Sequence, residues 1–165
     1  MRFVVGETNY AFEVEHVREI VHPAAVTLLP SLPASVSGVA DHRGEVVPIV
    51  DLRMRFGMQS ARTAVERSEK WILMTSSVGV VGFVVDRVID VVGTNEAPDH
   101  APQIGGAVER GIKGVIPSDE GLLFILDVEK LAVVIKDADG SLSARISSFP
   151  GPPSGAAGDR SGTGA

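Results

Sequence analysis

Hydrophobic residues along the chain gather in short runs that have about the length of a β-strand. Valine dominates these runs, which include residues 46–50, 80–85 and 122–126. Each run is rich in branched side chains and is bounded by Gly, Asp or Ser, a pattern that favours strands over helices. The pattern therefore predicts an all-β fold with few short helices.

Helical periodicity is limited to two short segments. Val14, Val17 and Val21 would share one face of a helix, because residues three and four apart lie on the same side. We therefore expect a short helix over residues 14–21. A second short helix is expected over residues 128–136, after the last apolar run.

The C-terminal segment has a composition that is unsuited to folding. From Pro150 onward, ten of the sixteen residues are Gly, Pro or Ser, and none is aromatic. Such a segment cannot bury enough apolar surface to offset the entropy that it loses on ordering. We expect a disordered tail over residues 137–165 and a second disordered stretch over residues 94–107.

The sequence contains an internal duplication. Residues 10–21 align with residues 81–92 at an offset of 71, and share one phenylalanine, three valines and two acidic positions. A second pair follows in the same order, because residues 38–52 align with residues 114–128 at an offset of 76. In both members of this pair, Gly-Val leads after thirteen residues to an aspartate and an apolar residue. Two matching pairs in one order indicate repeated units.

The repeats, residues 10–52 and 81–128, predict two similar small β-units. Units of this size cannot cover all their apolar surface alone, so we expect them to pack face to face and share a core. Asp51 and Asp127 each follow an apolar run at the same place in the two repeats. We interpret both as local caps whose carboxylates accept backbone N–H groups, and not as catalytic groups.

Length and charge limit the classes of function. At 165 residues the chain can bury one sizeable core, or two small barrels that share one. It has no cysteine, which excludes disulfides and thiolate chemistry, and its formal net charge of −6 disfavours nucleic-acid binding. No apolar stretch approaches the roughly 20 residues that span a bilayer, and the start lacks a signal-peptide pattern. We expect a cytoplasmic protein with no direct membrane insertion.

The histidines do not form a recognisable metal or acid–base motif. His16, His22, His42 and His100 match neither HxxxH nor HExxH, and no G-x-S-x-G elbow or P-loop is present. We expect no metal, no cofactor and no catalytic residue. Among the four, His42 is next to Arg43 and is the one that could tune binding with pH.

Several motifs together resemble a known family. The first is residues 10–20, which end in Val-Arg-Glu-Ile. The others are the pair Pro30 and Pro33, and residues 38–39, 41–44, 48–56, 81–88, 112–114 and 122–131. In this order, and over about residues 3–135, the chain resembles the CheW family of bacterial chemotaxis coupling proteins. One departure concerns Asp41-His42, because the family usually has Asn-Leu before the Arg-Gly pair; it leaves open a dedicated or divergent pathway.

The resemblance implies a fold and a role. The implied fold is two SH3-like five-stranded β-barrels with exchanged strands and a shared core, in a domain over residues 1–136. The implied role is a non-catalytic adaptor that couples the cytoplasmic tip of a methyl-accepting chemoreceptor to a CheA-type histidine kinase. The kinase's regulatory domain has the same fold in that family, so the chain is expected as a monomer or in rings with the kinase, recruited to receptor arrays.

The resemblance also implies two sets of site residues. Receptor-binding residues are expected at Val17, Glu19, Ile20, Asp41, Arg43, Gly44, Val88 and Val91. Kinase-binding residues are expected at Val26, Thr27, Val36 and Ser37.

Each set has a plainer interpretation. Arg43 would be either a partner-binding side chain on an exposed turn or an ordinary solvated arginine. The four apolar receptor residues would line a groove or belong to the core, and we expect at least one of them to be fully buried. The kinase set would be an open strand edge or a loop that protects that edge.

Other functions remain open from the sequence. A small-barrel hydrolase would use His42, Asp41 and a serine such as Ser37, although their spacing does not place a base on a nucleophile. A nucleic-acid-binding barrel would need a basic face with interleaved aromatic residues, which one Trp and one Tyr supply poorly. A same-fold regulatory module of a divergent two-component pathway would bind other partners.

Overall fold

The computed structural model describes residues 1–59, 68–91, 99–100 and 110–135. The strands are β1 (Arg2–Val5), β2 (Thr8–Ala11), β3 (Val17–Val21), β4 (Val36–His42), β5 (Glu45–Asp51), β6 (Lys70–Ser76), β7 (Gly79–Val85), β8 (Arg87–Asp90), β9 (Asp99–His100), β10 (Ile112–Ser118) and β11 (Gly121–Leu126). The helical elements are the 3₁₀ turn η1 (Val14–His16), α1 (Leu52–Arg55) and a helical segment over 128–135. Within the described ranges, no helix has the length and apolarity that a membrane span requires.

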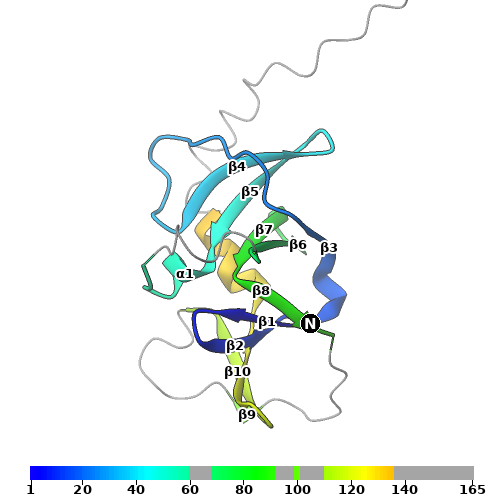
Figure 1. Ribbon diagram of the computed structural model, residues 1–165. Coiled ribbons are helices and arrows are strands. Elements are labelled where there is room, and N and C mark those ends of the chain that lie inside the picture. The colour runs from blue at the N-terminus through cyan, green and yellow to red at the C-terminus, as the bar shows by residue number, and fades with distance from the viewer. Residues whose placement is uncertain (60–67, 92–98, 101–109, 136–165) are drawn as a thin grey trace, which may run out of the picture.

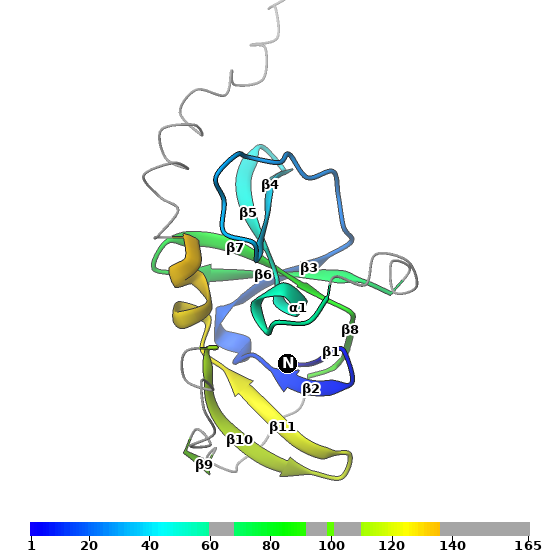
Figure 2. The same cartoon turned by 90° about the vertical axis from the view of Figure 1, so that its left-hand side faces the viewer.

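The strands form two sheets. Sheet I has the order β8-β1-β2-β11-β10-β9, and sheet II has the order β3-β6-β7-β5-β4. Sheet II lies in the upper half of Figure 1 and sheet I in the lower half. In Figures 1 and 2 both α1 and the helical segment over 128–135 lie where the two sheets meet.

Each sheet is assembled from both halves of the chain. Sheet I joins β1 and β2 to β8, β10 and β11, whereas sheet II joins β6 and β7 to β3, β4 and β5. When the first five strands are matched to β6, β7, β8, β10 and β11, the two orders agree over five strands, and β9 adds a sixth strand at the edge of sheet I. Each sheet also has one parallel pair at the equivalent place, β2 with β11 and β7 with β5. The predicted all-β fold of two barrels with exchanged strands is thus confirmed.

The largest hydrophobic cluster is shared between the sheets. Phe12, which directly follows β2, packs against Phe3 of β1 and Phe83 of β7, with ring centroids 4.9 and 5.3 Å apart. All three rings are buried. Leu52 of α1 and Leu131 of the helical segment are fully buried in the same cluster. Because side chains of both sheets meet here, neither sheet covers its apolar face alone.

Each sheet has a second, smaller cluster of its own. In sheet II it contains Ala40, Val47, Ile49, Trp71 and Leu73. In sheet I it contains Ala11, Ile116, Leu123 and Ile125. Because the central strands contribute to a cluster on each face, both sides of these strands are apolar. The valine-rich runs therefore do not alternate between apolar and polar residues.

The two repeated aspartates act as caps. Asp51 Oδ1 accepts the N–H groups of Arg53 and Met54 at 2.8 and 3.3 Å, where β5 leads into α1. Asp127 Oδ1 accepts the N–H of Lys130 at 3.2 Å, where β11 leads into the helical segment. Both contacts satisfy N–H groups that the first turn of a helix leaves free. The predicted capping role is confirmed at both positions.

The structure corrects two predictions on local structure. The expected helix over 14–21 is instead the single turn η1 followed by β3, because β3 gains backbone pairing with β6 that outweighs a weak helical period. Within the stretch 94–107, residues 99–100 form β9 and pair with β10. The rest of that stretch and the tail over 137–165 lie outside the described residues. The second predicted helix is present over 128–135.

Candidate protein-binding site

A two-residue turn between β4 and β5 presents Arg43 to solvent. His42 pairs with Glu45 across the hairpin, which leaves Arg43 and Gly44 as the loop. Their φ angles are 54° and 83°, and two central residues with positive φ are the mark of a type I′ turn. Asp41 Oδ1 accepts the Gly44 N–H at 2.9 Å. The turn is therefore fixed locally, while the Arg43 side chain remains 75% exposed.

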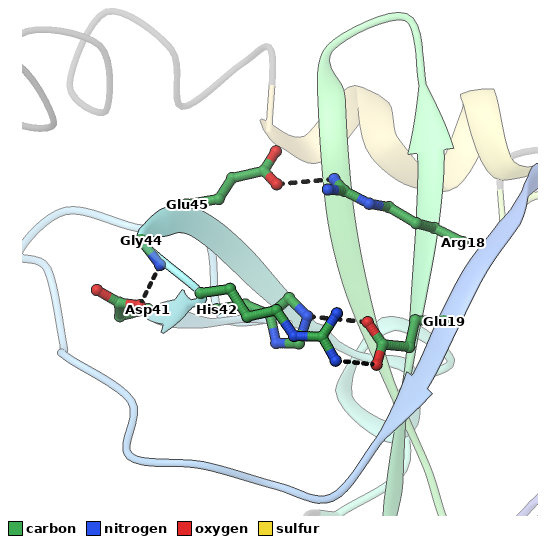
Figure 3. Close-up of polar contacts among 7 residues, drawn as sticks. Arg18, Glu19, Asp41, His42, Gly44 and Glu45 are labelled. Carbon is green, nitrogen blue, oxygen red and sulfur yellow. Dashed lines mark hydrogen bonds and ion pairs between the residues drawn. The ribbon is translucent and has the colours of Figure 1, made fainter.

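Glu19 of β3 contacts two adjacent residues of this hairpin. Its Oε1 accepts a hydrogen bond from Arg43 Nη2 at 2.8 Å, and its Oε2 lies 3.0 Å from His42 Nε2. On the neighbouring position, Arg18 Nη1 donates to Glu45 Oε2 at 2.7 Å. Figure 3 shows these contacts joining β3 to the tip of the β4–β5 hairpin.

These ion pairs lie between the two edges of sheet II. β3 and β4 are the outer strands of that sheet and are not hydrogen-bonded to each other in it, so side chains bridge the gap near the hairpin tip. Arg18, Arg43 and Glu45 are exposed, and exposed ion pairs contribute little stability, about 0–1 kcal/mol each. Their role is mainly positional, and Arg43 can leave Glu19 at small cost.

Sheet I closes in a related way through a residue that sequence reasoning missed. Arg2 of β1 donates to both carboxylate oxygens of Asp90 and also contacts Glu120 of the β10–β11 turn. Asp90 aligns with Glu19 in the repeat. Matching the acidic positions of the repeats could have indicated a second closing contact, although it could not have identified Arg2 as the partner.

Two of the four apolar receptor-site residues, Val17 and Ile20, lie on the edge strand β3, and Val88 and Val91 take the equivalent places in the edge strand β8 and directly after it. Val17 of β3 and Val88 of β8 are half-buried and pack against the shared core. Ile20 and Val91 are 40% and 63% exposed. The expectation that at least one of the four would be fully buried is wrong, because edge strands leave one side of each chain uncovered. Among these four residues, Ile20 and Val91 are therefore the ones whose side chains are accessible to a partner.

The edge of β4 is covered at one residue by the chain itself. Thr27 exchanges two backbone hydrogen bonds with Val39, at 2.7 and 3.0 Å. At the equivalent edge of sheet I, β9 pairs with β10. These contacts support the protective interpretation at Val39.

The four expected kinase-site residues differ in accessibility. Val36 is 6% exposed and lies in the shared core, so its side chain is unavailable to a partner, and Ser37 lies at a β-bulge. Val26 is half-buried against the sheet II cluster, whereas Thr27 is exposed. Next to Thr27, Leu28, which is not among the predicted site residues, is 77% exposed. The kinase-binding role of Val26, Thr27, Val36 and Ser37 stays a prediction.

Gly38 allows the close approach of Thr27. A Cβ on Gly38 would lie 2.3 Å from the Thr27 carbonyl oxygen, and its φ is +136°. We expect Gly38→Ala to lower the free energy of unfolding by about 2 kcal/mol or more, from backbone strain and the lost Thr27–Val39 bridge. Urea unfolding measures this. Gly121→Ala is the control, because Gly121 has φ +109° with nothing near its Cβ, and equal losses would contradict the role of Thr27.

The residues of the hydrolase hypothesis are used differently. His42 contacts Glu19, and Asp41 accepts the Gly44 N–H; neither contact involves Ser37. Within the described ranges, no group of three or more potential metal-ligating side chains is found. A cavity of about 40 Å³ lies at the end of the sheet II barrel, lined mainly by apolar residues and by His42 and Trp71. Its size suits water rather than an organic substrate.

Comparisons with known proteins agree over the folded part of the chain. Residues 1–136 match the family model described as CheW-like domain. The chemotaxis protein CheW of Klebsiella aerogenes is 33% identical over 133 residues, which cover 78% of this chain and 78% of that protein. A probable chemotaxis protein CheW of Rhizobium etli is 31% identical, covering 78% and 83%. Protein FrzA of Myxococcus xanthus is 30% identical, covering 78% and 81%.

A solved structure has the same fold. The scaffolding protein TtCheW from Thermoanaerobacter tengcongensis superposes with a TM-score of 0.70 and 22% sequence identity, over 79% of this chain and 88% of that chain. At this identity the match concerns the fold. Together with the family model and the curated relatives, the double barrel and the Arg43 turn lead to one conclusion: this chain belongs to the CheW-like family.

Proposed function

We propose that the chain is a non-catalytic adaptor that couples a methyl-accepting chemoreceptor to a CheA-type histidine kinase. It works in the cytoplasm at receptor arrays, in a chemotaxis-like or motility pathway. The observation that carries this proposal is the Arg43 turn. It places an exposed guanidinium group, which is held by one weak ion pair, against Glu19 of β3, the strand that also carries the exposed Ile20.

The receptor side is formed by β3 and the β4–β5 hairpin. Arg43 offers a planar fork of donors that fits a carboxylate on the partner. Ile20 supplies apolar area, and Val91 supplies the same directly after the equivalent strand of sheet I. A helical receptor tip that carries acidic and apolar residues at helical spacing would match this combination.

The kinase side lies around Thr27 and Leu28. Thr27 uses its backbone N–H and carbonyl on Val39, so edge pairing at that residue is already satisfied within the chain. Recognition there would depend on the exposed side chains of Thr27 and Leu28 and on the still open parts of the edge. The regulatory domain of the kinase, with a related barrel, is the proposed partner.

The test of the proposal is the charge reversal Arg43→Glu. We expect the variant to keep its fold and its unfolding midpoint, because Arg43 is exposed and contributes little stability. Its affinity for the soluble cytoplasmic fragment of a methyl-accepting receptor from the same organism should fall at least tenfold, because a carboxylate then faces a carboxylate. Affinity for the kinase regulatory domain should be unchanged. Calorimetry on the purified full chain measures both.

Arg18→Glu is the matched control. Arg18 is also an exposed arginine that forms one ion pair with a glutamate on the same hairpin, but it is outside the expected receptor set. Receptor binding that falls equally in both variants would show a general charge effect. Unchanged receptor binding by Arg43→Glu would contradict the proposal.

A same-fold module that binds other two-component proteins is the second candidate. The observation that favours it is the Asp41-His42 pair in the turn, where His42 ties the hairpin to Glu19. Co-purification of partners from native cells separates the two candidates, because the second predicts neither a methyl-accepting receptor nor a CheA-type kinase among them.

A further inference from the structure

We propose that His42 is a positioning residue whose protonation releases Arg43 from Glu19, so that partner binding by this turn strengthens as pH falls. The proposal deepens the receptor-binding role proposed above for Arg43 and rests on it. It depends on a contact between His42 and Glu19 that is made by residues of this chain alone.

The geometry places two adjacent side chains on one carboxylate. Glu19 Oε1 is 2.8 Å from Arg43 Nη2, and Glu19 Oε2 is 3.0 Å from His42 Nε2. The His42 side chain is 21% exposed and forms part of the wall of the cavity at the barrel end. The Arg43 side chain is 75% exposed. The imidazole is therefore held in place, whereas the guanidinium group has room to move into solvent.

Protonation changes the balance on Glu19. A neutral imidazole with its proton on Nε2 donates a hydrogen bond to Glu19 without adding charge, and leaves Arg43 as the only cation on this carboxylate. Histidine side chains gain a second proton between about pH 8 and pH 5. Two cations then share one carboxylate at hydrogen-bond distance, where they compete for it and repel each other. The exposed Arg43 is the one that leaves, because the loss of its contact is compensated by water.

The other charged groups near His42 have partners of their own. Asp41 accepts the Gly44 N–H, Glu45 accepts from Arg18, and His22, which lines the same cavity, contacts Lys70 Nζ at 3.1 Å. Glu19 is the group that connects His42 to Arg43, so the effect of protonation on Arg43 passes through this residue.

The expected effect is a rise in affinity for a carboxylate-bearing partner. With Arg43 free of its internal partner, binding to the receptor fragment should strengthen about fivefold between about pH 8 and about pH 5.5. In His42→Leu, which removes the titratable ring, the same change of pH should alter affinity less than about twofold. Glu19→Gln should bind as strongly at the higher pH as the wild-type chain binds at the lower pH.

The experiment measures two quantities on the full chain. Isothermal titration with the soluble receptor fragment gives the affinity at both pH values for the wild type, His42→Leu and a His22→Asn control. NMR of the Arg43 side chain in the unbound chain gives the rotation rate of its guanidinium group, which the Glu19 contact slows. We expect this rotation to become faster at the lower pH in the wild type and in His22→Asn, and to stay constant in His42→Leu.

The two readouts separate failure of this proposal from failure of the proposed function. An equal pH response of affinity in the wild type and His42→Leu would overturn the role of His42. A rotation rate of Arg43 that does not change with pH in the wild type would overturn it as well. If no variant binds the receptor fragment at either pH, the proposed receptor partner is wrong. The rotation rate in the unbound chain would then still decide whether His42 controls the Glu19–Arg43 contact.

Discussion

Replacing Asp86 with alanine should lower the free energy of unfolding by about 3 kcal/mol, one of the two largest losses expected for a single substitution in this chain. Asp86 is the one buried charged residue of the described core. Its Oδ1 accepts from Arg53 Nε at 2.7 Å, and its Oδ2 accepts the Gly6 N–H at 2.7 Å. The hydrogen bond to Asp86 raises the pKa of Arg53, which therefore stays charged.

The location of Asp86 explains the size of this effect. It links α1, which follows a strand of sheet II, to the β1–β2 turn of sheet I. Its side chain is 12% exposed and that of Arg53 is 19% exposed. Removing the carboxylate leaves a largely desolvated guanidinium group and an unsatisfied N–H at the contact between the barrels. Unfolding in urea, followed by the fluorescence of Trp71, measures the change.

Two further variants test the explanation. Asp90→Ala also removes an aspartate that pairs with an arginine, but Asp90 is 47% exposed, so we expect a loss of about 1 kcal/mol or less. Adding Arg53→Met to Asp86→Ala should recover part of the loss, because the orphaned charge is then absent. Equal losses for the two aspartates, or no recovery in the double variant, would contradict a role for burial.

The duplication was enough to predict the architecture but not its local details. Valine-rich runs and repeated aspartates indicated strands, turns and a shared core, because apolar pattern and capping chemistry are local properties of sequence. The segment 14–21 was predicted as a helix, since Val14, Val17 and Val21 also fit a helical period. Pairing of β3 with β6, in which the partners Val21 and Trp71 are already fifty positions apart, decided the outcome, and no local pattern reports such a contact.

The candidate site was likewise predictable only in part. The exposed Arg43–Gly44 turn could be predicted, because a two-residue Arg-Gly loop between strands is visible in the sequence. The contacts of Glu19 with His42 and Arg43 could not, since they join residues that are 23 and 24 positions apart. Burial of Val36 was also missed, because an apolar residue at a strand edge can face either a partner or the core.

Phe83→Ala should be the most destabilising core substitution, with a loss of about 3–5 kcal/mol. Phe83 is fully buried in β7 of sheet II, and its ring packs against Phe12, which directly follows β2 of sheet I, with a centroid separation of 5.3 Å. The substitution removes a large ring from the cluster that both sheets need. Because the strands of the two halves are exchanged, we expect one cooperative unfolding transition in which both sheets lose protection together.

Amide hydrogen exchange followed strand by strand measures this coupling. In Phe83→Ala, exchange at β10 and β11 of sheet I should accelerate by a factor similar to that at β5 and β7 of sheet II, since global unfolding exposes both. Leu73→Ala is the comparison, because Leu73 lies in the cluster of sheet II alone. If the two barrels unfolded independently, both variants would accelerate amide exchange in sheet II and leave exchange in sheet I unchanged. Acceleration confined to sheet II in Phe83→Ala would contradict a fold that is held together by its shared core.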